Sequence, residues 1–233
     1  MYNRQKIKAI LHPIVTSAYE AESSDNDLRK NTLDVFSASI DSAIRGISFD
    51  EWLLQEKQRQ VQKTLQNRIG ELHQEILGTF DGVNSLGVGE IIDLKSTSKK
   101  FIAEIKNKHN TTKGNHKTMV YDDLEACLKG EDPDVIAYYV EVLPRNGKTY
   151  NEPFTPPDNV LKTRRPLNER IRRIDGMSFY TLASGSTETL LEIYKLIPEL
   201  IAEILYESYA ITINPKNSIS LPEFNIIFNS SKE

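Results

Sequence analysis

GEIIDLKSTSKKFIAEIKNKHNTTKGNHK, residues Gly89–Lys117, predicts two short strands joined by a polar turn and followed by a basic loop. The first strand is expected at residues 90–94, which are mostly apolar. Residues 95–99 contain only lysine, serine and threonine, and this composition favours a turn. The second strand is expected at residues 101–106, where the residue pattern alternates between the two faces of a sheet.

Two acids and one lysine are brought together by this hairpin. Successive side chains of a strand point to opposite faces, so Glu104 and Lys106 are expected to share one face. Antiparallel pairing of the two strands around the turn brings Asp93 near Glu104. The hairpin therefore predicts two carboxylates and an ammonium group at one end of a sheet.

These side chains suit the hydrolysis of a phosphodiester, which needs a hard divalent cation held by oxygen ligands. The candidate Mg²⁺ ligands are Asp93, Glu104 and the main-chain carbonyl of Ile105. Lys106 is the candidate group that holds or helps to deprotonate the attacking water. The alternative is a surface hairpin with solvated side chains, because a Glu-x-Lys triplet is common.

A basic loop follows the second strand. Residues 95–117 contain seven lysines and one acid, in a chain whose net charge is −4. Such a local excess predicts a surface that faces phosphate groups, and the alternative is a solvated loop. The candidate DNA contacts of this loop are Lys108, His109, Asn110, Thr111, Lys113, Asn115, His116 and Lys117.

A second basic run lies at residues 161–173, with six basic residues and one acid. Arginine is the usual reader of guanine in the major groove, so one or two of these arginines are expected to contact bases. The alternative is a solvated arginine-rich helix. With two basic residues of the preceding turn, the candidates are Arg145, Lys148, Arg164, Arg165, Arg172 and Arg173.

Upstream of the hairpin, the sequence predicts a long helix over residues 49–77. Ser48 and Glu51 form a capping box at its start. Glu71 is the candidate for an additional metal ligand from this helix, and the alternative is a solvated helical acid. Gly70 lowers helix stability and is expected to allow close packing. His73 is expected to pack or to contact phosphate, because hard Mg²⁺ prefers oxygen ligands.

Residues 104–111, EIKNKHNT, resemble the catalytic strand and loop of the PD-(D/E)XK type II restriction endonucleases. More narrowly, they resemble the small family whose members cut GGNCC-type sites. Two further blocks carry the narrower resemblance, RIGELHQEILG at Arg68–Gly78 and IDGMSFY at Ile174–Tyr180 with the following Ser184-Gly185. The resemblance covers most of residues 67–198. The chain departs from the motif in that Ile92, not proline, precedes Asp93.

The resemblance implies an α/β fold, with a restriction-endonuclease-like mixed β-sheet core flanked by helices. Residues 1–66 would form a helical N-terminal region for packing or dimerisation, and residues 67–233 would form the nuclease core, both within one compact domain. It also implies a homodimer that uses Mg²⁺ to cut both strands of a short palindromic GGNCC-like DNA site, leaving 5′-phosphates. A DNA methyltransferase would belong to the same system. The alternatives are a structure-selective repair or junction nuclease and a non-catalytic DNA-binding protein.

The remaining sequence bounds these expectations. The 233 residues are enough for a sizeable core, and neither a membrane-length apolar run nor a signal-peptide pattern occurs, so a cytoplasmic protein is expected. A single cysteine, Cys127, excludes an internal disulfide. Residues 32–47 and 188–209 are expected as helices that pack or dimerise. Strands are expected at residues 134–142, 175–180 and 223–228.

Overall fold

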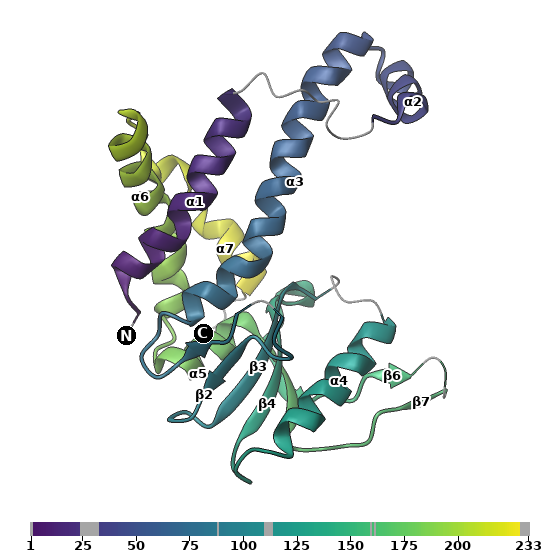
Figure 1. Ribbon diagram of the computed structural model, residues 1–233, viewed down its shortest axis with the longest axis vertical. Coiled ribbons are helices and arrows are strands. Elements are labelled where there is room, and N and C mark those ends of the chain that lie inside the picture. The colour runs from purple at the N-terminus through teal and green to yellow at the C-terminus, as the bar shows by residue number, and fades with distance from the viewer. Residues whose placement is uncertain are drawn as a thin grey trace.

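The computed structural model describes residues 2–23, 33–87, 89–109, 114–158, 160 and 162–228, and for residues 114 and 115 it describes the backbone only. Helices and strands are labelled in Figure 1. The helices are α1 Arg4–Ser23, α2 Val35–Arg45, α3 Phe49–Leu77, α4 Gly114–Leu128, α5 Gly176–Ser184, α6 Thr189–Tyr209 and α7 Leu221–Phe228. Two 3-10 turns lie at Arg145–Gly147 and Pro215–Ser218. The strands are β1 Asn84–Ser85, β2 Leu94–Ser96, β3 Phe101–Lys108, β4 Ile136–Leu143, β5 Asn151–Pro153, β6 Pro157–Asp158, β7 Thr163–Arg164 and β8 Ile171–Asp175.

A mixed six-stranded sheet forms the centre of the described chain, with the strand order β1-β2-β3-β4-β8-β5. β2 pairs antiparallel with β3, as the sequence predicts. β3, β4 and β8 are parallel to one another, and β5 pairs antiparallel with β8. The predicted mixed α/β fold with flanking helices is therefore confirmed.

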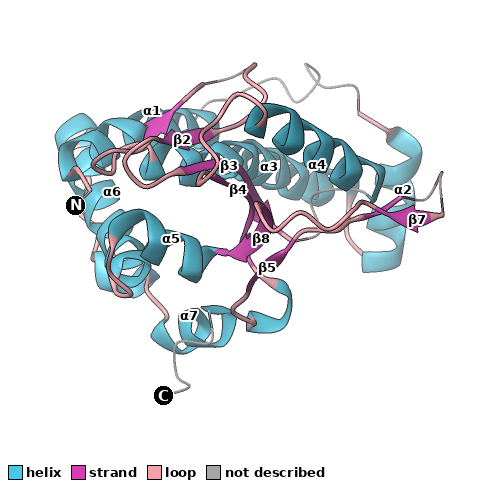
Figure 2. Cartoon of the chain, turned by 90° about the horizontal axis from the view of Figure 1, so that it is seen from below, coloured by secondary structure: helices cyan, strands magenta, loops and turns pink. Residues whose placement is uncertain are grey.

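Helices cover both faces of this sheet. Figure 2 shows the strands between α4 on one side and α5 and α6 on the other. Phe101, Ala103 and Ile105 of β3 join the large core beneath α1, α3, α5 and α6, whereas Ile102 joins the smaller core beneath α4. The alternation along β3 therefore places Glu104 and Lys106 together on the α4 face, and the prediction that they share one face is confirmed.

The hairpin is displaced by a few residues from its predicted bounds. Its first strand is β2 at Leu94–Ser96, whereas residues 90–93 precede the strand and the turn lies at residues 97–100. The reason is Ser96, whose buried hydroxyl donates to the Gly82 carbonyl at 2.6 Å and accepts from the Lys99 amide. This tertiary contact overrides the local turn preference of the residue.

Two predicted strands are helices in the structure. Residues 176–184 form α5, because Asp175 caps this segment by accepting a hydrogen bond from the Ser178 amide at 3.0 Å. Residues 221–228 form α7, which buries Phe224 and Phe228 against the main core. Conversely, the alternative of an arginine-rich helix fails, since Ile171–Asp175 is strand β8 of the main sheet.

The N-terminal helices behave in two different ways. Ile7 and Leu11 of α1 lie in the same core as the strands, whereas α3 extends away from the sheet and carries α2 at its far end (Figure 1).

The predicted capping box of Ser48 and Glu51 is present, and α3 has the predicted bounds. The predicted division at residues 66 and 67 falls inside α3, and that division stays a prediction. Within the described ranges, none of the helices combines the length and the apolarity that a membrane crossing requires.

Two glycines of the resembling blocks differ in what surrounds them. A Cβ atom on Gly176 would lie 2.3 Å from the Val142 carbonyl oxygen, so α5 approaches β4 closely at this point. A Cβ atom on Gly70 would meet nothing within 4 Å. The expectation that Gly70 permits close packing is therefore wrong within the described chain.

Gly176→Ala is expected to destabilise the protein by about 1–3 kcal/mol, because the backbone of β4 cannot yield without disturbing the sheet. Gly70→Ala is the matched control and is expected to stabilise the protein by about 0.5–1 kcal/mol, because alanine favours an exposed helix. Urea unfolding followed by circular dichroism measures both changes. Equal stability of the Gly176→Ala variant and the wild type would contradict the close approach.

Candidate active site

Asp93 and Glu104 are brought together by the pairing of β2 with β3. The register places Leu94 opposite Ala103, and the Asp93 amide donates to the Ala103 carbonyl at 3.0 Å. One carboxylate oxygen of Asp93 accepts a hydrogen bond from the Ile105 amide at 2.6 Å. The two carboxyl groups lie close enough for the Asp93 charge to raise the pKa of Glu104. The predicted convergence of these two acids is present in the structure.

Lys106 completes the group. Its Nζ atom lies 2.6 Å from Oε1 of Glu104, and both side chains are partly buried, with 33% and 15% of their surfaces exposed. The three side chains thus occupy one end of the hairpin, on the edge of the sheet face that α4 covers. This arrangement is the one expected from the Asp…Glu-x-Lys spacing.

Both carboxyl groups are held in an environment that disfavours their charge. Burial raises the pKa of Asp93, although the Ile105 amide and the Lys106 ammonium act in the opposite direction. Burial raises the pKa of Glu104, and the neighbouring Asp93 charge raises it further. Two desolvated like charges at short distance make a site that a cation would stabilise.

The donor set fits a hard divalent cation. The Ile105 amide points toward Asp93, and in a strand the carbonyl of the same residue points to the same side. Asp93, Glu104 and the Ile105 carbonyl are therefore three oxygen donors on one edge of β3. Among the described residues, no group of three or more His, Cys, Asp or Glu side chains forms a metal-binding cluster. Further ligands would be water or substrate oxygens.

Glu71 lies on α3, the helix that precedes the hairpin. It is exposed on α3, and it lines a cavity of about 330 Å³ with Arg68, Glu75 and residues of α1. α3 packs on the sheet face opposite to Glu104, because its Leu72 and Ile76 belong to the large core. The role of Glu71 as a metal ligand stays a prediction, without a contact to support it.

A neighbouring residue of α3, not singled out from the sequence, approaches the site instead. The Gln74 amide nitrogen lies 3.5 Å from the Asp93 carbonyl and 3.4 Å from the Ser85 hydroxyl. It links α3 to the segment that presents Asp93. Its position in the RIGELHQEILG block was the available signal.

Several predicted DNA contacts are engaged within the protein. Arg165 binds Asp122 and Asp158, Arg172 binds Asn151 and Glu169, and Arg173 binds Glu152, all through their guanidinium groups. Lys117 binds Glu141 at 2.8 Å. Lys108, His116, Arg145, Lys148 and Arg164 are exposed, and His109 is half-buried. The residues Asn110, Thr111, Lys113 and the Asn115 side chain lie outside the described structure.

The buried acids beside the site were also missed from the sequence. Glu141 on β4 and Asp175 at the end of β8 have 3% and 0% of their surfaces exposed. The register aligns Lys106 with Glu141 and Glu141 with Asp175, so the three side chains form a row across the parallel strands. The one acid inside the apolar run VIAYYVEV, residues 135–142, was the signal that could have identified Glu141.

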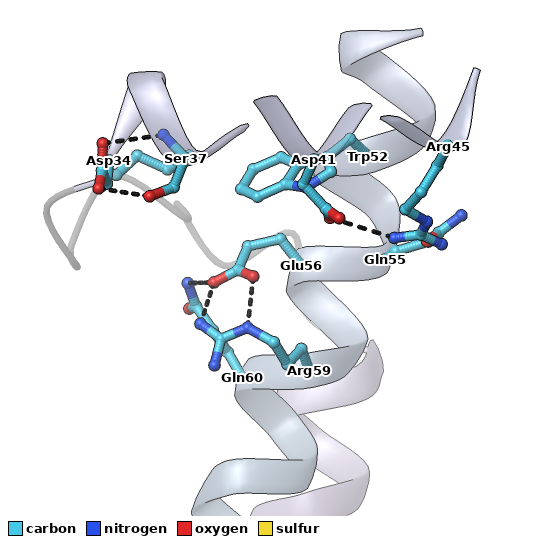
Figure 3. Close-up of a pocket in the computed structure, with 10 residues that line it drawn as sticks. Asp34, Ser37, Asp41, Arg45, Trp52, Gln55, Glu56, Arg59 and Gln60 are labelled. Carbon is cyan, nitrogen blue, oxygen red and sulfur yellow. Dashed lines mark hydrogen bonds and ion pairs between the residues drawn. The ribbon is translucent and has the colours of Figure 1, made fainter. Parts of the chain in front are cut away.

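A larger cavity, of about 620 Å³, lies between α2 and α3 (Figure 3). Its acids are already paired with side chains of the same two helices or their caps. Asp34 caps α2 and Glu56 binds Arg59, while Asp41 accepts hydrogen bonds from Trp52 and Arg45. The cavity is therefore part of the packing between α2 and α3, and none of the residues lining it belongs to the hairpin.

Asp93→Asn is expected to raise the melting temperature of the metal-free protein at neutral pH. Because the folded-state pKa of Asp93 is raised, the stability associated with its protonation is present below pH 3.8 and is lost as the pH rises through the folded pKa. Asparagine does not ionise, so the difference in melting temperature between the variant and the wild type should grow with pH. Differential scanning calorimetry between pH 4 and pH 8 measures this trend.

Asp34→Asn is the control with the opposite sign, because hydrogen bonds from Ser37 lower the pKa of Asp34. This variant should lose stability at neutral pH and approach the wild type in acid. A loss of stability for Asp93→Asn at neutral pH would contradict the unfavourable burial of the Asp93 charge.

Comparison with known proteins identifies the family. A sequence model described as Eco47II restriction endonuclease matches residues 3–206. The type II restriction enzyme Eco47II of Escherichia coli is 38% identical over 189 residues, which cover 80% of this chain and 79% of that enzyme. The type II restriction enzyme Sau96I of Staphylococcus aureus is 30% identical over 207 residues, covering 87% and 77% of the two chains. The chain belongs to the Eco47II restriction endonuclease family and is a type II restriction endonuclease.

Proposed function

We propose that this type II restriction endonuclease uses Asp93, Glu104 and Lys106 to hydrolyse both strands of a short palindromic DNA site with Mg²⁺. The observation that carries the proposal is the convergence of two partly buried carboxyl groups, Asp93 bonded to the Ile105 amide and Glu104 bonded to Lys106. A GGNCC-like site is the proposed target, and a DNA methyltransferase of the same system would protect host DNA. The family match favours this function over a repair nuclease or a non-catalytic protein.

The proposed roles follow from the chemistry of each group. Asp93 and Glu104, with the Ile105 carbonyl, would hold the divalent cation. When bound, the cation would polarise the scissile phosphate and lower the pKa of a water molecule. Lys106, already beside Glu104, would orient the attacking water and offset the charge that develops on the phosphate. The leaving 3′-oxygen takes up a proton, which gives 5′-phosphate and 3′-hydroxyl ends.

Exposed basic residues near the carboxyl ends of the parallel strands support a DNA-binding edge. Lys108 ends β3, and Arg145 and Lys148 follow β4 directly. Parallel strands end at one edge of a sheet, so these residues and the active site belong to the same edge. Arg165, Arg172 and Arg173 would have to exchange protein carboxylates or amides for DNA, and they are the weaker candidates.

Plasmid DNA incubated with the protein and Mg²⁺ is expected to give discrete fragments with 5′-phosphate ends. Glu104→Gln and Lys106→Ala are each expected to lower the cleavage rate by at least about 100-fold, because each removes a group that contacts the reacting phosphate or water. Glu90→Gln is the matched control, since Glu90 is an exposed acid three residues before Asp93. Gel analysis and end sequencing measure the rate, the site and the cut position.

Fragments produced at the wild-type rate by the Glu104→Gln and Lys106→Ala variants would contradict the active-site assignment. Faster cleavage of branched DNA than of linear duplex would instead favour the structure-selective alternative.

We also propose that the enzyme is a homodimer, because a two-fold DNA site requires two active sites related by two-fold symmetry. An exposed apolar stripe on α2 suits such an interface. Phe36, Ile40 and Ile44 follow one another at spacings of four residues, and 80%, 61% and 79% of their surfaces are exposed. The helix was expected either to pack or to dimerise, and these three residues do not pack within the described chain.

Ile40→Asp is expected to convert the dimer to a monomer, because a buried aspartate in a two-fold apolar interface would lack a counter-charge. Ile226→Asp is the control, since Ile226 on α7 is 67% exposed and lies outside the stripe. Sedimentation velocity measures the mass of each variant. Dimers that persist in the Ile40→Asp variant would contradict the assignment of this interface.

A further inference from the structure

Glu141 is a buried carboxylate on the strand next to the proposed catalytic lysine. Only 4% of its side-chain surface is exposed. The parallel register pairs Lys106 of β3 with Glu141 of β4, so both side chains leave the sheet on the α4 face. Adjacent strands lie about 4.8 Å apart. The Glu141 carboxylate is therefore within the reach of a lysine side chain at position 106.

Two other groups bind the Glu141 carboxylate. Lys117, in the first turn of α4, binds Oε1 at 2.8 Å, and the Tyr150 hydroxyl donates to Oε2 at 2.5 Å. The Lys117 ammonium also stands 5.4 Å from the centre of the Tyr139 ring and donates to the His109 carbonyl at 3.4 Å. Both carboxylate oxygens are thus satisfied without a contribution from Lys106.

Two acid–lysine pairs consequently lie side by side. Lys106 forms an ion pair with Glu104 of its own strand, and Lys117 of α4 forms an ion pair with Glu141 of the next strand. An unpaired carboxylate in this buried position would be strongly destabilising. Without Lys117, the Lys106 ammonium is the neighbouring charge that could relieve it.

We propose that Lys117 is a positioning residue, which neutralises Glu141 so that Lys106 stays on Glu104 and the attacking water. This inference rests on the proposed function of Glu104 and Lys106. It differs from the sequence-based expectation for Lys117, in which this lysine contacts DNA. It assigns to the Glu141–Lys117 pair a role in the rate of the chemical step and not in DNA affinity.

If the Glu141–Lys117 ion pair were purely structural, its removal would have a different effect. Loss of such a pair lowers stability and leaves the cleavage rate of the folded protein unchanged. A DNA-contacting lysine predicts weaker binding of the DNA site, with a smaller change in the rate at saturation. Only the positioning role predicts that a second substitution, which removes the Glu141 charge, restores the rate.

The test compares single-turnover cleavage by the full-length protein at saturating enzyme and Mg²⁺. Lys117→Met is expected to slow cleavage by about 10- to 100-fold, because Lys106 is drawn away from its productive position. The dissociation constant for an oligonucleotide carrying the cleaved site, measured with Ca²⁺ in place of Mg²⁺, should stay at the wild-type value. The double variant Lys117→Met/Glu141→Gln should regain most of the lost rate, because no buried charge then competes for Lys106.

Lys8→Met is the matched control for the loss of a partly buried ion pair. The Lys8 side chain is 18% exposed, against 23% for Lys117, and it binds Glu203 and Glu207 of α6 at 3.2 and 2.7 Å. It is expected to lower the melting temperature and to leave the cleavage rate unchanged. Should Lys117→Met not fold, Lys117→Gln is the second variant, with the same slow cleavage expected.

Three outcomes overturn the positioning role. They are wild-type cleavage by the Lys117 variants, a double variant as slow as the single one, and a loss of affinity that accounts for the slower cleavage. Glu104→Gln and Lys106→Ala run beside these variants as references. If the reference variants are active, the proposed active site is wrong, whereas inactive references with a fast Lys117→Met variant reject the positioning role alone.

Discussion

The antiparallel pairing of β2 with β3 is the constraint on which the proposed active site depends. A register with Leu94 opposite Ala103 sets Asp93 beside Glu104 and directs one Asp93 oxygen to the Ile105 amide. A slip of one residue would send the side chains of one strand to the other face. The buried hydroxyl of Ser96, bonded to Gly82, and the large core beneath β3 hold this register.

The same pairing buries two carboxyl groups whose charged forms are unfavourable there. Burial raises the pKa of Asp93, and burial together with the neighbouring Asp93 charge raises the pKa of Glu104. In the folded protein, the apolar contacts of Phe101, Ala103 and Ile105 offset this cost by joining the main core. A cation held by these carboxylates would relieve this cost, in keeping with the proposed role of the two acids as metal ligands.

The parallel strands provide the second organising element. Lys106, Glu141 and Asp175 lie in one row across β3, β4 and β8, near the carboxyl ends of these strands. Asp175 accepts hydrogen bonds from the Tyr150 and Ser178 amides, and Tyr150 in turn donates to Glu141. The row therefore connects the segment before β5 and the start of α5 to the strand beside the proposed catalytic lysine. Polar side chains here organise loops around a rigid sheet.

The sequence alone determined the hairpin, its two acids and lysine, the capped helix α3 and the family, because each rests on local spacing or on short motifs. Tertiary structure decided what local patterns cannot contain. Asp175 reads as the start of a strand, yet its contact with the Ser178 amide and the close packing of Gly176 on Val142 make a helix. The reach of the Glu71 carboxylate depends on α3, which packs on the opposite face of the sheet from Glu104, and its role as a ligand stays a prediction. Glu141 became recognisable only when the parallel register set it beside Lys106. Side-chain identity is local, whereas the face on which a side chain emerges and the charge beside it depend on strands distant in sequence.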